Sequence, residues 1–139
     1  MPDTHSQDTE RARALVKSFY AGGARGEITS FADSLDEKFE LFVPEYLPWG
    51  GTFNKAQYVA MLPRVAANLD FEHMRYESLT AEGGHVVALI NIPVQGTKES
   101  ILISEHWDIA NDKAIRLRVA YFDARALLNN QPRKKTSRA

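Results

Sequence analysis

The sequence predicts an α+β fold in which helices come first and long antiparallel strands follow. Two observations support this class. Apolar residues recur at helical spacing in the first third of the chain, and the second half holds long β-like runs bounded by turn signals. Helices followed by strands are typical of α+β domains, in which the helices cover one face of a sheet. We expect one domain, residues 1–139, with flexible ends at about 1–5 and 129–139.

Three helices are expected in the first half of the chain. The first spans Thr4 to Ala21 and is stopped by a pair of glycines, and the second, shorter one carries an apolar stripe that ends at Leu35. Asn54 is a good cap for the third helix, which Pro63 should kink. Because these helices are amphipathic, they need an apolar surface to lie on.

The strands are expected after each break that glycine and proline introduce. The predicted strands are Phe39 to Val43, Leu69 to Leu79, His85 to Gln95, and the two arms of a hairpin from Ser100 to Asp123 with its turn at Asn111-Asp112-Lys113. Between the first strand and the third helix lies a loop, EYLPWGGTF, in which we expect Trp49 to be covered.

Composition argues against several classes of protein. The chain has no cysteine, which excludes disulfides, thiolate nucleophiles and sulfur-ligated metals. Its net charge of -1 gives no global attraction to nucleic acid, and only the end after Pro132, with four cationic residues, is basic. We find neither a signal segment nor an apolar run long enough to span a membrane. We expect a soluble, cytoplasmic protein without nucleic-acid or membrane partners.

No motif for a cofactor or a metal is present. The sequence contains neither GxGxxG nor GxxxxGK[ST], and no GxSxG elbow. The histidines are scattered without HxH or HExxH spacing: His5, His73, His85 and His106. We therefore expect a pocket that works without a cofactor and without a metal.

The order of elements, together with the segments LPWGGTF and RVAYFD, resembles the NTF2-like cone fold and its SnoaL-like polyketide-cyclase and ketosteroid-isomerase-like branch. The resemblance covers about residues 6–128 and bears on the fold more than on the activity. It implies three helices packed on a curved, mainly antiparallel sheet, with a conical pocket on the concave face. It also implies a small-molecule ligand and a homodimer that forms through the convex face.

The resemblance to the isomerase can be followed position by position. Glu105 falls where that enzyme keeps a carboxylic acid that stabilises an oxyanion. Phe19 replaces its tyrosine and Val43 its aspartate base, so steroid isomerisation is not expected. Tyr20 and Glu45 lie one or two residues from these two gaps.

Glu105, Arg118 and His73 are the candidate catalytic residues. We expect Glu105 and Arg118 on one covered face of the hairpin, with Arg118 gripping a carboxylate or enolate and Glu105 exchanging a proton. The structural alternative is a buried ion pair that seals the cone. His73 would face the same side, although a slip of one residue would turn it away.

Two other residues enter if that strand register is wrong. His106 alternates away from Glu105 and is expected on the convex face, but with the other register it would form a pair with Asp123. Asp123 is otherwise expected to bond the backbone at the end of its strand.

Aromatic side chains are expected around the pocket as substrate-binding residues. They are Phe19, Tyr20, Trp49, Tyr58, Trp107 and Phe122. We expect Leu117, Val119 and Tyr121 on the opposite, convex face, where they would form a dimer contact.

Two functions remain open at this point. The first is a small enzyme that isomerises, dehydrates, cyclises or hydrolyses a hydrophobic carbonyl compound by acid/base chemistry. The second is a non-catalytic ligand-binding or dimerisation module of the same fold. An open cavity beside Glu105 would favour the first, whereas a filled cone or a Glu105 locked against Arg118 would favour the second.

Overall fold

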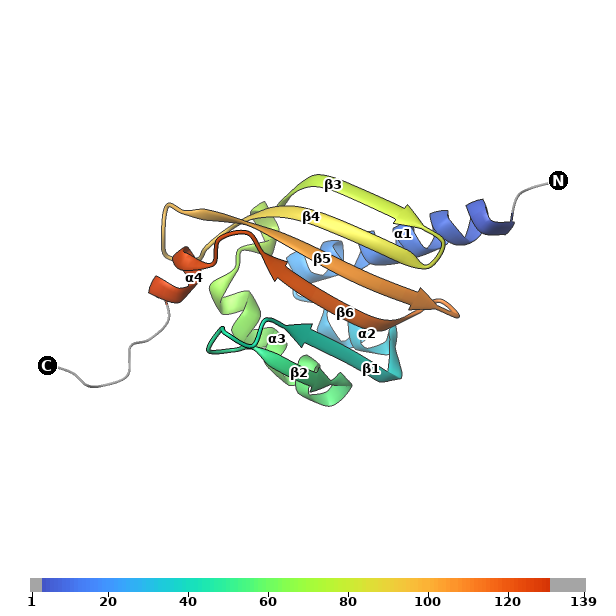
Figure 1. Ribbon diagram of the computed structural model, residues 1–139, viewed down its shortest axis with the longest axis horizontal. Coiled ribbons are helices and arrows are strands. Elements are labelled where there is room, and N and C mark those ends of the chain that lie inside the picture. The colour runs from blue at the N-terminus through green and yellow to red at the C-terminus, as the bar shows by residue number, and fades with distance from the viewer. Residues whose placement is uncertain (1–3, 131–139) are drawn as a thin grey trace, which may run out of the picture.

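The computed structural model describes residues 4–130, whose helices and strands are drawn in Figure 1. In chain order the elements are α1 (Thr4–Ala24), α2 (Ile28–Asp33), β1 (Leu35–Val43), β2 (Gly51–Asn54), α3 (Lys55–Asn68), a 3-10 turn (Phe71–His73), β3 (Arg75–Glu82), β4 (His85–Pro93), β5 (Ser100–Ala110), β6 (Lys113–Tyr121) and α4 (Arg125–Asn130). The predicted α+β class is confirmed.

One six-stranded sheet organises the chain, with the strand order β2-β1-β6-β5-β4-β3. All neighbouring strands are antiparallel except β1 and β6, which run parallel. Helices α1, α2 and α3 lie on one face of this sheet, and α4 lies at one end of it (Figure 1). The sheet therefore has one face covered by helices and one outer face.

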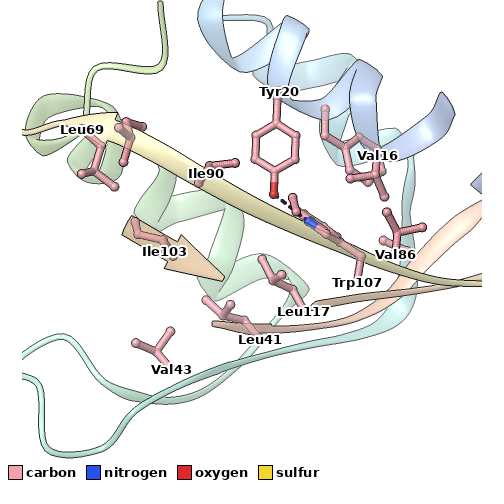
Figure 2. Packing of buried hydrophobic residues seen from close by; sticks show 14 of the residues in the cluster. Val16, Tyr20, Leu41, Val43, Leu69, Val86, Ile90, Ile103, Trp107 and Leu117 are labelled. Atoms are coloured by element: carbon pink, nitrogen blue, oxygen red, sulfur yellow. Dashed lines mark hydrogen bonds between the residues drawn. The ribbon is translucent and has the colours of Figure 1, made fainter. Parts of the chain in front are cut away.

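The apolar core fills the space between the helices and the sheet (Figure 2). Along β4 every second side chain is fully buried, and these are Val86, Ala88, Ile90 and Ile92. Val16 of α1 and Trp107 of β5 meet this layer from the helix side and from the neighbouring strand. The alternation along β4 arises because successive strand side chains point to opposite faces.

The predicted elements form, with shifted boundaries. Helix α1 continues through the glycine pair to Ala24, and Leu35, predicted at the end of a helix, begins β1 and is fully buried. Pro63 lies inside α3 without ending it. The predicted strand from Leu69 to Leu79 is wrong in its first half, where the chain forms a single bridge at Leu69 and then the 3-10 turn.

The turn of the β5–β6 hairpin has two residues, Asn111 and Asp112, with φ values of 53° and 61°. Positive φ at both positions is typical of a type I′ turn, whose twist matches that of the flanking strands. Lys113, predicted in the turn, already pairs with Ala110.

A register shift follows the turn and decides which side chains share a face. Ile109 pairs with Ala114, but Asp108 pairs with Arg116, so one extra residue of β6, Ile115, is accommodated in between. Such a bulge reverses the facing of every residue beyond it relative to its partner strand. Without it, Glu105 would lie opposite Arg118; with it, Glu105 lies opposite Val119.

Helix α4 was not predicted. It contains Leu127, which is buried, and it begins just after Asp123, whose carboxylate accepts a hydrogen bond from the backbone N–H of Arg125 at 3.0 Å. The expected bond between Asp123 and the backbone is confirmed. Of the predicted flexible ends, residues 4–5 lie in α1 and 129–130 in α4, while the remainder, with the basic end after Pro132, lies outside the described residues.

Among the helices of residues 4–130, none combines the length and the apolar character needed to cross a membrane.

Asn54 caps the N-terminus of α3, and its contribution to stability can be measured by mutation. The Asn54 side chain accepts from the Gln57 backbone N–H at 2.9 Å, and the Gln57 side chain accepts from the Asn54 N–H at 2.8 Å. We expect Asn54→Ala to lower the free energy of unfolding by about 1 kcal/mol, measured by urea denaturation. Asn54→Asp keeps the acceptor and should retain most of that stability. Equal losses in both variants would contradict the capping role.

Candidate functional site

A cavity of about 150 Å³ lies between the helices and the inner face of the sheet. Its walls come from α1, the α1–α2 connection, α2, α3, the loop before β2, and the inward side chains of β1, β5 and β6. The lining is mostly apolar and rich in aromatic rings, which include Phe19, Tyr20, Trp49, Tyr58, Trp107 and Tyr121. Glu105 of β5 is the carboxylate set in the middle of these rings.

Three side chains form a hydrogen-bond chain at one wall of the cavity. The buried Trp107 Nε1–H donates to the Tyr20 hydroxyl oxygen at 2.9 Å, and the Tyr20 O–H donates to Glu105 Oε1 at 2.5 Å. Figure 2 shows Tyr20 pointing from α1 down to the Trp107 indole on the sheet. These hydrogen bonds connect α1 with β5, which are far apart in the sequence, and they hold Glu105 in position.

The second carboxylate oxygen of Glu105, Oε2, accepts no hydrogen bond within residues 4–130. It is not fully buried, and Glu105 lines the cavity, so a bound molecule can reach this oxygen. Burial raises the pKa of Glu105, and the hydrogen bond from Tyr20 opposes that rise. Burial is the stronger effect, so the carboxyl accepts a proton more readily than an exposed glutamate does.

Tyrosine hydroxyls surround this carboxyl and keep their protons. Burial and the charge of Glu105 raise the pKa of Tyr58 well above its ordinary value and that of Tyr76 to about 12. Tyr58 stacks on Phe39 with ring centroids 5.2 Å apart. The Tyr58 hydroxyl has no hydrogen-bond partner among the described residues and remains open to the cavity. It can therefore donate a hydrogen bond to a bound molecule.

The loop before β2 closes one side of the cavity with Trp49. Its indole N–H donates to the Tyr121 hydroxyl at 3.2 Å, and the two rings meet edge to face. The loop folds tightly behind it, because a Cβ at Gly50 would lie 1.8 Å from the Pro44 carbonyl oxygen. Only glycine fits there, and the expected covering of Trp49 is confirmed in that the side chain is partly buried.

Glu105 and Arg118 do not share a face, and the expectation that they do is wrong. The bulge in β6 places Val119 opposite Glu105 and turns Arg118 to the outer face opposite His106. There the Arg118 side chain is half exposed, and its guanidinium lies 3.6 Å from the Asp108 carboxylate. Within residues 4–130 Glu105 forms no ion pair, and Arg118, on the outer face, cannot hold a ligand inside the cavity.

His73 also lies outside the cavity, contrary to expectation. It ends the 3-10 turn, its side chain is 68% exposed, and its ring bonds the Asp70 carboxylate at 2.7 Å. That bond raises the pKa of His73. Together with Glu72 these side chains bring their ligand atoms within 4.8 Å of one another, a grouping that a search for HxH or HExxH spacing misses. It is an exposed cluster without further support for a metal.

Of the six aromatic residues expected around the pocket, all but Phe122 line the cavity. Phe122 follows β6 with a side chain that is 66% exposed, and it is not part of the cavity wall. The expectation that Leu117, Val119 and Tyr121 face outward is wrong, because the bulge turns all three into the cavity. Tyr121 could have been found from the sequence only if the register shift had been known.

The remaining candidates, His106, Asp123 and Glu45, lie outside the cavity. His106 lies on the outer face as expected, with its Nε2 2.9 Å from the Ser104 hydroxyl. Its pKa is lowered by burial and by the neighbouring His85 and Arg118. Asp123, the alternative partner of His106, is bonded to Arg125 instead. Glu45 is exposed and lies outside the cavity wall.

The raised pKa of Glu105 should make stability depend on pH. The folded state holds this proton more tightly than the unfolded chain, so the free energy of unfolding falls as pH rises from the ordinary glutamate value of 4.5 through the raised folded value. The slope is at most about 1.4 kcal/mol per pH unit for one proton. Glu105→Gln removes this decline, which urea denaturation between pH 4.5 and 8 would measure. Parallel pH profiles for the two proteins would contradict the raised pKa.

Comparison with known proteins identifies the fold through structure and not through sequence. No protein-family model matches the chain, and no curated protein matches it. A candidate ketosteroid isomerase from Kribbella flavida superposes with a TM-score of 0.72 at 16% identity, over 95% of this chain and 92% of that one. A candidate SnoaL-like polyketide cyclase from Jannaschia sp. CCS1 gives 0.72 at 15% identity, over 89% and 95%.

A third similar structure was solved with a bound organic molecule. TerC, co-crystallised with polyporic acid, superposes with a TM-score of 0.69 at 21% identity, over 86% of this chain and 96% of that one. An NTF2-like protein from Burkholderia xenovorans LB400 superposes with a TM-score of 0.68 at 21% identity, over 87% of this chain and 95% of that one. Four helices on an open six-stranded sheet, together with these superpositions, show that this chain has the NTF2-like fold.

Proposed function

We propose that this protein is a cofactor-free acid/base enzyme that acts on a small hydrophobic carbonyl compound bound in the cavity. One observation carries the proposal. A carboxyl group with a raised pKa has one oxygen held by Tyr20 and the other open to an aromatic cavity. Burying a carboxyl costs free energy, and a structural role would require partners for both oxygens. A pocket acid of this kind is typical of proton transfer.

The chemistry uses two of the polar groups that line the cavity, Glu105 and Tyr58. The Glu105 carboxylate takes a proton from the carbon next to the substrate carbonyl, and the electron pair of that C–H bond moves into an enolate. The Tyr58 hydroxyl donates a hydrogen bond to the developing enolate oxygen. Glu105 then returns the proton to a different position of the same intermediate. Isomerisation, dehydration and cyclisation all begin with this first step.

The similar structures support a small organic ligand. Two of them are candidate members of the ketosteroid isomerase and SnoaL-like cyclase groups, and TerC was crystallised with polyporic acid. The alternative is a binding module that holds such a ligand without reaction. The free oxygen of Glu105 favours the enzyme, because a general base needs an oxygen that no group of the protein already holds.

Hydrogen exchange at carbon tests the proposal without knowledge of the natural substrate. We expect the protein to accelerate exchange of the α-hydrogens of small apolar ketones such as 2-tetralone and 4-phenylbutan-2-one in D₂O, followed by proton NMR. Glu105→Gln should reduce the acceleration by roughly 10²-fold or more, because it removes the base and keeps the shape. Tyr58→Phe should reduce it less.

The control for this experiment is Glu77→Gln, which changes an exposed carboxylate on β3. It should exchange as fast as the unmodified protein. Exchange by Glu105→Gln at the original rate, or no acceleration of either ketone by the unmodified protein, would show that the cavity does not perform this step.

We further propose that two copies associate through the outer face of the sheet. The dimer contact predicted from the sequence, Leu117, Val119 and Tyr121, is not available, because these side chains face the cavity. Other apolar side chains support the proposal: Val87 and Leu89 of β4 alternate with the buried set and are only partly covered in the single chain. Light scattering at micromolar concentration should give twice the chain mass, and Leu89→Asp should give the monomer. A monomeric unmodified protein would refute the proposal.

A further inference from the structure

A second, smaller hollow of about 90 Å³ adjoins the main cavity between α3, α4 and the loop before β2. The two share a wall, because five residues line both: Trp49, Met61, Val65, Leu69 and Tyr121. The hydrogen-bonded pair of Trp49 and Tyr121 stands in this wall. The smaller hollow is therefore an extension of the cavity at the end where α4 packs.

The extension differs from the main cavity in carrying a cation. Arg64 of α3 lines it, and within residues 4–130 the guanidinium makes no ion pair or hydrogen bond. Most other arginines of this part of the chain bond a carboxylate, as Arg11 bonds Asp112 and Arg125 bonds Asp123. A guanidinium without a carboxylate partner is free to bind one from a ligand, since its planar N–H groups match a carboxylate.

The main cavity is unfavourable for a negatively charged group of a ligand, because Glu105 and Glu27 line it. Glu105 lies in the main cavity, and its charge repels a second carboxylate nearby. Glu27 lines the cavity beside the α1–α2 connection, and Arg25 there is already bonded to Glu27 at 2.9 Å. Among the cavity and its extension, Arg64 is therefore the place where a negative group of a ligand finds an unpaired cation.

We propose that the ligand is an apolar carbonyl compound with a carboxylate tail, and that Arg64 binds this carboxylate in the extension while the apolar body lies beside Glu105. The inference rests on the proposed function, because it assigns the substrate class of the same cavity. Asn68 lines the extension beside Arg64, and its side-chain amide donates to the main-chain carbonyl oxygen of Arg64 at 2.8 Å.

The chain supplies its own probe for binding. It has two tryptophans, Trp49 and Trp107, and both line the main cavity, so tryptophan fluorescence reports occupancy of this cavity. The matched ligands are 4-phenylbutanoate and its neutral analogue 4-phenylbutanamide, titrated at pH 7.5. They have the same phenyl group and carbon chain and differ in charge at the end of the chain.

We expect the unmodified protein to bind 4-phenylbutanoate roughly five- to tenfold more tightly than the amide, the range of one charge-assisted contact at a partly exposed site. Arg64→Gln should abolish this preference without weakening the amide. Arg64→Lys keeps the charge and should retain part of the preference. The control is Arg75→Gln, which changes an exposed arginine of β3 outside both hollows and should have no effect.

The outcomes separate the two proposals. If both ligands bind equally to the unmodified protein, or if Arg64→Gln keeps the preference, the carboxylate site is refuted and the proposed acid/base function remains. If neither ligand changes the fluorescence of the unmodified protein, the carboxylate site is likewise refuted, and the hydrogen-exchange experiment with the two ketones decides the acid/base function separately.

Discussion

The hydrogen bond from Tyr20 to Glu105 is the interaction on which the arrangement of the cavity depends. It joins α1, which covers the sheet, to β5 at its centre, and the Trp107 indole extends the connection. A carboxyl in an apolar cavity loses the solvation of its charged form, and one donor at 2.5 Å restores only part of that loss. The remaining destabilisation of the charged form is what raises the pKa of Glu105 and prepares it to hold a proton.

The two faces of the sheet carry different charged groups: Glu105 lies on the inner face, and Asp108 with its cationic partners lies on the outer face. Inside, Glu105 lies among aromatic rings and protonated tyrosines. Outside, Asp108 gathers Arg116, at 2.7 Å, and His85, at 3.0 Å, and these contacts lower its pKa although burial opposes that change. The outer ion pairs are partly exposed and contribute little to stability. The bulge in β6 places both arginines of that strand on this outer face, which leaves Glu105 without an opposite charge.

The sequence predicted the fold, the position of Glu105 in the cavity and most of its aromatic wall, because alternation and helical spacing are local patterns. It did not predict the face of Arg118. That face depends on Ile115, one residue whose extra place in β6 is a feature of the pairing and not of the local pattern. His73 was misplaced because Asp70 accepts from the His73 backbone N–H and starts a 3-10 turn where the apolar pattern suggests a strand. Tyr20 appeared as a neighbour of the position where the isomerase has its tyrosine, and only the packing of α1 brings its hydroxyl to Glu105.

The parallel pair of β1 and β6 has a consequence for biosynthesis. β1 leaves the ribosome early, but its neighbour on one side is the last strand of the sheet, and the two meet across about half of the chain's length. Until β6 emerges, Leu41 and Val43 have only the short strand β2 beside them, and the floor of the cavity does not exist. Contacts between such distant segments form late and slowly. Helix α1 can pack on β3 and β4 as soon as these strands are made, but the part of the sheet around β1 and the pocket above it are completed only after β6 has followed.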